Sequence, residues 1–112
     1  NLQDCGYLLE IGGKRFLQPG DSFLLEDHLI QEKIDVLFFS PTEHNMHIKN
    51  SLTLIEKLQP KYIMPQHHST VVVNESTFFW AKGYQKEVRD KLSETLAKRY
   101  YILEPGDKVQ ID

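Results

Sequence analysis

The chain has 112 residues, of which 40% are hydrophobic and 26% are charged, and it carries a net charge of -3 with a pI near 5.9. These values describe one ordinary globular domain with a modest core, small for an enzyme. The acidic balance argues against a nucleic-acid-binding surface, and no apolar run approaches the ~18 residues that span a bilayer. We therefore expect neither nucleic acid nor a membrane among its partners.

The first residues of the chain suggest a longer parent polypeptide, and its cysteine content suggests a cellular compartment. The sequence begins Asn1-Leu2-Gln3-Asp4, with no initiating methionine and no signal peptide, which suggests a piece of a longer polypeptide. Cys5 is the single cysteine, so an intramolecular disulfide is excluded and a reducing, cytoplasmic location is expected. A small packed residue is a simpler interpretation of Cys5 than a nucleophile or a metal ligand.

The first third of the chain predicts a β-hairpin. Strands over 7–11 and 15–17 flank Gly12-Gly13, a pair that readily takes the positive φ of a tight turn. Pro19-Gly20 then ends the second strand. A short amphipathic helix is expected over 24–33.

The middle of the chain predicts a strand, a helix and a strand. Residues 34–40 form a strongly apolar run before Pro41, which favours a buried strand. Apolar residues recur at helical spacing over 48–58 ahead of Pro60, and 62–64 form another short strand. Short connections in such a unit predict parallel neighbours in one sheet.

The last third predicts a long helix from Ser76 to Arg99 and a closing hairpin of 100–103 with 108–111. The helix is inferred from a stripe of apolar residues at Phe79, Trp80, Tyr84, Val88, Leu92 and Leu96. The expected fold class is α+β, with one mixed sheet of about six strands and two or three helices. A sheet with helices on one side leaves an apolar face that needs a cover, either missing residues or a second copy of the chain. We therefore expect homo-oligomers.

Two motifs place metal-binding side chains directly after strands. Pro19-Gly20-Asp21-Ser22 follows the hairpin, and Pro65-Gln66-His67-His68 follows the strand over 62–64. Carboxylate and imidazole groups bind divalent ions, Zn foremost, with Mn, Fe and Ni also compatible. Taken singly, Asp21 also fits a turn or helix cap, and each histidine also fits a hydrogen-bonded structural residue.

A third cluster lies in the loop after the strand over 34–40. His44 and His47 are three residues apart and would face the same way on a helical turn. The simpler interpretation is a helix start with exposed histidines and Asn45 as the N-cap. This loop leaves the carboxyl end of its strand, as the other two motifs do, and ligands bind parallel sheets at that end. We therefore expect the three motifs to converge.

In this order, the motifs resemble the C-terminal half of a metallo-β-lactamase-fold hydrolase, and most closely the group of metal-dependent hydrolases that includes ascorbate-6-phosphate lactonase. The resemblance lies in the hairpin over 6–14 that leads into Pro-Gly-Asp-Ser, the segment over 60–70, and the final segment over 103–109. It implies an αββα sandwich of two mixed sheets. Residues 1–112 would then form a single, partial domain, the C-terminal half.

The resemblance also implies a site and a reaction. Asp21 would bridge two metal ions and His67 would bind the second. His68, His44, His47 and Ser22, which replaces a threonine, would line the site. The implied reaction is attack by a metal-bound hydroxide on a small-molecule ester, lactone or phosphoester.

The sequence departs from the family where most metal ligands are expected. The His-x-His-x-Asp-His motif is absent, and so is the histidine that normally precedes the first strand. Asp21 and His67 alone would hold a metal loosely, so we expect a hydrolase when the protein is complete and an inactive chain by itself. Two alternatives are a non-catalytic half-domain that serves binding or assembly, and an unrelated α+β domain in which Asp21 and His67 lie far apart.

Overall fold

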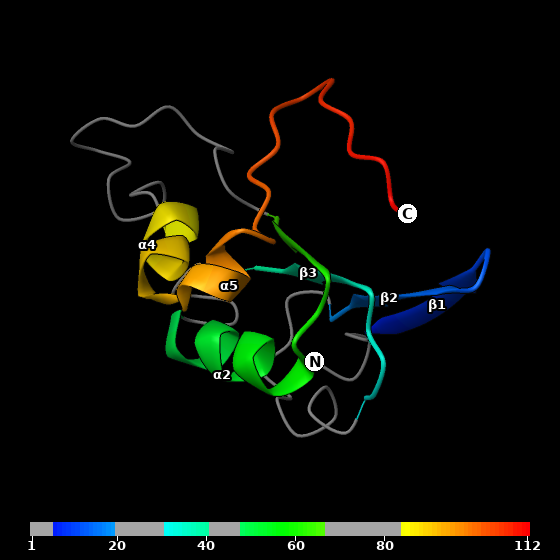
Figure 1. Ribbon diagram of the computed structural model, residues 1–112, viewed down its shortest axis with the longest axis horizontal. Helices are drawn as coiled ribbons and strands as arrows, with labels where there is room; N and C mark the ends of the chain where they lie inside the picture. Colours follow the sequence, from blue (N-terminus) through cyan, green and yellow to red (C-terminus); the bar gives the residue numbers. More distant parts are fainter. Residues whose placement is uncertain (1–5, 20–30, 41–47, 67–83) are drawn as a thin grey trace.

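The computed structural model describes residues 6–19, 31–40, 48–66 and 84–112 (Figure 1). Its elements in chain order are β1 (Tyr7–Ile11), β2 (Lys14–Gln18), β3 (Val36–Phe39), α2 (Ile48–Leu58), β4 (Tyr62–Pro65), α4 (Tyr84–Lys91) and α5 (Glu94–Ala97). The strands form a sheet in the order β1-β2-β3-β4, antiparallel between β1 and β2 and parallel thereafter. The predicted α+β class with a mixed sheet is confirmed. In the described ranges, no helix is long and apolar enough to cross a membrane.

The predicted hairpin and the predicted strand-helix-strand unit are both present. Gly12 and Gly13 make the turn between β1 and β2 with φ of 58° and 79°. The β3–α2–β4 unit is a crossover that leaves β3 and β4 parallel, as expected from its short connections. α2 ends at Leu58, two residues before Pro60, where the helix cannot continue without losing a hydrogen bond.

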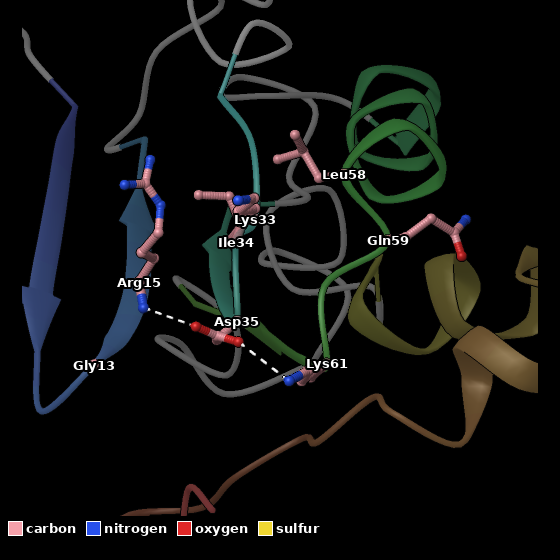
Figure 2. A pocket seen from close by; sticks show the side chains of 8 residues that line it. All are labelled: Gly13, Arg15, Lys33, Ile34, Asp35, Leu58, Gln59 and Lys61. Carbon is pink, nitrogen blue, oxygen red and sulfur yellow. Dashed lines mark hydrogen bonds and ion pairs between the residues drawn. The ribbon is translucent and has the colours of Figure 1, made fainter.

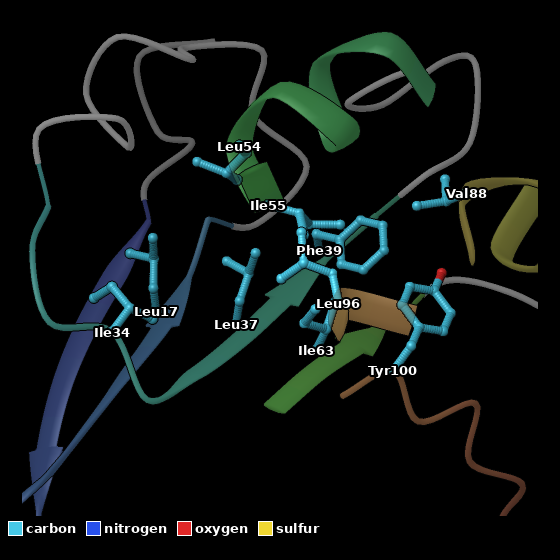
Figure 3. Packing of buried hydrophobic residues seen from close by; sticks show 10 residues of the cluster. All are labelled: Leu17, Ile34, Leu37, Phe39, Leu54, Ile55, Ile63, Val88, Leu96 and Tyr100. Carbon is cyan, nitrogen blue, oxygen red and sulfur yellow. The ribbon is translucent and has the colours of Figure 1, made fainter. Parts of the chain in front are cut away.

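The described helices pack on one face of the sheet, where they enclose the core (Figure 3). Alternate residues of the strands point to this face, because successive side chains of a strand lie on opposite sides. The core contains Leu17, Ile34, Leu37, Phe39, Leu54, Ile55, Ile63, Val88, Leu96 and Tyr100. This burial on the helical face is the main source of stability of the described fold.

The opposite face of the sheet is apolar and is only partly covered. Val36 is fully buried on it, and Tyr62 stacks on Tyr101 with ring centroids 5.8 Å apart. Toward β1 the cover ends, since Leu9 is 47% exposed and Ile11 is 62% exposed. The expectation of an apolar face in need of a cover is therefore correct for the β1 side of the sheet.

The long helix predicted to run to Arg99 is wrong at its C-terminal end. α4 ends at Lys91, and Ser93 starts α5 with an extended backbone (φ -60°, ψ 159°). Its hydroxyl accepts the Leu96 backbone N–H at 3.3 Å, a cap that competes with helix continuation. The apolar stripe is nevertheless confirmed at Val88 and Leu96, which are both buried. The start of this predicted helix, over 76–83, lies outside the described residues.

The closing hairpin is also wrong, although its turn is present. The Asp107 backbone N–H donates to the Glu104 carbonyl at 2.9 Å, but 100–103 and 108–111 are not paired as strands. Tyr100 instead forms an isolated parallel bridge with Ile63 at the edge of β4. The segment around Tyr100 thus forms main-chain hydrogen bonds with the edge of β4 instead of with residues 108–111.

Two further expectations need correction. The described part of the sheet has four strands rather than six, because the closing hairpin is missing from it. Of the short helix expected over 24–33, residues 31–33 are not helical, and 24–30 lie outside the described residues.

Four alternating charges form a row across the sheet, beside the point where β3 and β4 begin. In register order these are Glu10, Arg15, Asp35 and Lys61, hereafter the charged row. The Arg15 guanidinium pairs with Glu10, and its backbone N–H donates to Asp35 Oδ2 at 2.9 Å. Lys61 Nζ lies 3.6 Å from Asp35 Oδ1. Opposite charges on neighbouring strands favour this register over a shifted one.

Asp35 at the centre of the charged row predicts an acid-sensitive stability. The hydrogen bond from the Arg15 backbone N–H, together with the charge of Lys61, lowers the pKa of Asp35 below its ordinary 3.8. The unfolded chain therefore binds the proton more readily than the folded one. Stability from this group is present above the unfolded pKa and is lost as the pH falls through the folded pKa.

We expect Asp35→Asn to destabilise the fold by about 1 kcal/mol at pH 7, through loss of a charge-assisted bond. The difference from the parent protein should shrink at pH 3. Urea denaturation at both pH values measures it, with Asp90→Asn, at an exposed carboxylate, as the control. Equal pH dependence in the Asp35→Asn variant and the parent would contradict the assignment.

Candidate metal site at the carboxyl edge of the sheet

The parallel alignment brings the carboxyl ends of β2, β3 and β4 to one edge of the sheet. The last strand residues there are Gln18, Phe39 and Pro65. Each of the three predicted motifs follows one of these ends within a few residues. The strand order therefore supports the expectation that the motifs leave the sheet at the same edge.

All six predicted site residues lie outside the described residues. They are Asp21, Ser22, His44, His47, His67 and His68. Their convergence on one metal therefore stays a prediction. Within the described ranges, no group of three or more His, Cys, Asp or Glu side chains is arranged to hold a metal ion.

A reciprocal pair of amides links the strand ends from which two of the motifs depart. Gln18 Nε2 donates to Gln66 Oε1 at 2.7 Å, and Gln66 Nε2 donates to Gln18 Oε1 at 2.7 Å. The Gln66 backbone N–H also donates to the Phe39 carbonyl at 2.7 Å, which anchors it to the end of β3. This amide bridge joins residues 48 positions apart in the sequence, and β3 lies between their strands.

The amide bridge bears directly on the predicted metal ligands. Gln18 stands three residues before Asp21, and Gln66 stands immediately before His67. Two half-buried hydrogen bonds with good lengths restrict where both segments begin. Sequence reasoning did not identify this pair. The available signal was an amide side chain at the strand end before each motif.

We expect the two halves of the amide bridge to be energetically coupled. Gln18→Ala and Gln66→Ala should each lower the free energy of unfolding. The double variant should be less destabilised than the sum of the two single variants, by about 1 kcal/mol, because each single substitution already breaks both hydrogen bonds. Chemical denaturation of the four proteins gives this coupling energy. Gln110→Ala, at an exposed amide that bonds only within the C-terminal segment, is the control. Strict additivity of Gln18→Ala and Gln66→Ala would show that the bridge is not formed in solution.

No family model matches the chain, but it is similar to curated proteins over nearly its whole length. A UPF0173 metal-dependent hydrolase of Carboxydothermus hydrogenoformans is 32% identical over 111 residues, which are 94% of this chain and 45% of that protein. One of Symbiobacterium thermophilum is 31% identical over 92% of this chain and 46% of that protein. The chain thus spans about half the length of the curated relatives it matches.

Solved structures show the same fold. A protein described as a metal-dependent hydrolase from Parabacteroides distasonis matches with a TM-score of 0.64 at 19% identity, over 87% of this chain and 39% of that one. Igni18, a metallo hydrolase from Ignicoccus hospitalis, matches with a TM-score of 0.61 at 18% identity, over 93% and 44%. These likenesses confirm the predicted fold class, part of a metallo-hydrolase fold. The chain is therefore homologous to about half of a UPF0173 metal-dependent hydrolase.

Proposed function

We propose that the chain is the C-terminal half of a metal-dependent hydrolase, in which Asp21 and His67 are metal ligands. The observation that carries the proposal is the amide bridge, because it holds together the strand ends that lead into these two residues. The names of the curated relatives support the same class of enzyme. Ser22, His44, His47 and His68 would line the site.

The donor set fits a divalent metal ion. A carboxylate and an imidazole suit Zn, and also Mn, Fe or Ni. Two protein ligands are too few for a catalytic ion, so the remaining ligands would come from the part of the relatives that this chain does not span. When bound, such an ion supplies Lewis acidity and lowers the pKa of a coordinated water.

The residues of this chain would hold the metal ion and orient the bound substrate. Asp21 and His67 would fix the position of the ion, and the amide bridge would keep their segments at a constant separation. The neighbouring histidines and Ser22 would offer hydrogen bonds to a bound substrate. The substrate class that we propose is a small-molecule ester, lactone or phosphoester.

Replacement of the proposed ligands should lower metal content. In the full natural protein, Asp21→Asn and His67→Ala should each weaken metal binding at least tenfold, since even residues that only support ligands cost that much. Elemental analysis after dialysis measures this, and hydrolysis of p-nitrophenyl acetate and bis-p-nitrophenyl phosphate reports the activity.

His28→Ala is the matched control, because His28 is a histidine outside the three motifs. It should keep both metal and activity. Full metal content in the Asp21→Asn and His67→Ala variants would refute the assignment of ligands.

A second candidate function is a half-domain that serves assembly, and a specific surface favours it. Tyr7, Leu9 and Ile11 of β1 are 57%, 47% and 62% exposed, and the strand register places all three on the face of the sheet away from the helices. Such a stripe of apolar side chains at a sheet edge is typical of an interface. Its partner would be the other half of a longer protein or a second copy of the chain.

Adjacent leucines on opposite faces of β1 test this surface. In the full natural protein, Leu9→Lys should lower the free energy of unfolding by about 2–4 kcal/mol or dissociate an oligomer, because it would bury an unpaired charge. Leu8→Lys, on the helical face at the open edge, should have a smaller effect. Thermal unfolding and sedimentation measure the two outcomes. If Leu9→Lys changes neither, the surface is not an interface.

A further inference from the structure

A cavity of about 450 Å³ lies at the end of the sheet opposite to the carboxyl edge of β2, β3 and β4 (Figure 2). It is bounded by the hairpin turn, the charged row and the end of α2, and its lining residues are Gly13, Arg15, Lys33, Ile34, Asp35, Leu58, Gln59 and Lys61. The length of β3 separates it from the carboxyl edge, about 13 Å for four residues. The cavity is therefore separate from that edge of the sheet.

Two of its lining residues have an unusual backbone. Lys33 and Gln59 have φ of 55° and 48°, and they are the non-glycine residues with positive φ in the described chain. Gln59 directly follows the last residue of α2, at a position where glycine is common, and its N–H donates to the Ile55 carbonyl at 2.9 Å. Long polar side chains are thus present at two positions where glycine would be less strained. Both positions line the same cavity.

The charges around the cavity favour an anion. Three cationic side chains and one carboxylate, Asp35, line it. Arg15 is paired with Glu10 and Lys61 with Asp35, so the charge available to an anion comes chiefly from Lys33. Among the described contacts, the Lys33 ammonium has no ion pair or hydrogen bond. The chain as a whole is acidic, so this concentration of cations is local.

The negative end of α2 does not oppose an anion here. Arg99 Nη1 donates to the carbonyls of Gln59 at 3.4 Å and Pro60 at 3.2 Å, just beyond the helix. A cation therefore already compensates the partial negative charge of this helix end. Ile34 and Leu58 add an apolar wall, as is usual for a small-molecule pocket.

We propose that this cavity binds the phosphate group of a small molecule, through the ammonium groups of Lys33 and Lys61. Its volume lies in the range of small-ligand pockets, roughly 300–1,000 Å³. The ligand is identified only by this chemistry. The proposal does not depend on the hydrolase function.

Inorganic phosphate is the probe, titrated into the full natural protein by calorimetry with and without a metal chelator. Phosphate bound at the pocket should persist in chelator, whereas phosphate bound to a metal should be lost. Lys33→Gly should weaken the chelator-resistant binding about tenfold, through loss of a charged hydrogen bond. The same variant should raise the melting temperature, because glycine relieves the left-handed backbone.

Lys33→Met keeps an unbranched side chain only one atom shorter and should lose binding without the gain in stability. Lys57→Ala, in the last turn of α2 and outside the lining, is the control for general surface charge. An equal loss in Lys57→Ala, or no chelator-resistant binding at tens of millimolar phosphate, would overturn the proposal.

Discussion

The parallel alignment of β2, β3 and β4 is the constraint on which the rest of the structure depends. It is held at one end by the charged row and at the other by the amide bridge, with buried apolar side chains between. A shift of β3 by one residue would separate Asp35 from its partners and turn Leu37 away from the helices. Polar contacts thus select the register, while the apolar core supplies most of the stability.

This alignment gives the two ends of the sheet different chemistry. Neutral amides hold the carboxyl end together, and the segments that follow carry carboxylate, hydroxyl and imidazole groups. Charged side chains hold the other end, and three of the eight residues that line the adjoining cavity are cationic. Rigid strands that support variable loops are a common way to build sites, because the loops can change while the scaffold stays fixed.

The sequence predicted correctly those elements that depend on residues close together in the chain. The hairpin follows from Gly12-Gly13, and the β3–α2–β4 unit follows from an apolar run, a helical stripe and Pro60. The errors arose where distant contacts or caps prevail. Ser93 divides a continuous apolar stripe, and Tyr100 pairs with β4 rather than with its own neighbours in sequence.

The candidate site could be predicted only in part for the same reason. Residue types and their position after strands suggested metal ligands at Asp21 and His67. The link between Gln18 and Gln66 required the strand order, which places β2 and β4 on either side of β3. The charged row likewise becomes visible only when the register is known, although a charged residue precedes each of β3 and β4.

The bridge at Tyr100 has a consequence for how the sheet can grow. The Tyr101 N–H donates to the Ile63 carbonyl and the Ile63 N–H donates to the Arg99 carbonyl, both at 2.8 Å, so the margin of β4 is already capped by main chain. At the other boundary of the described strands stands β1, with apolar side chains exposed on both of its faces. Among the described strands, a further strand would therefore add more easily beside β1 than beside β4, where it would have to displace the segment at Tyr100. The same difference between the two edges makes β1 the strand at which misassembly of several chains would begin.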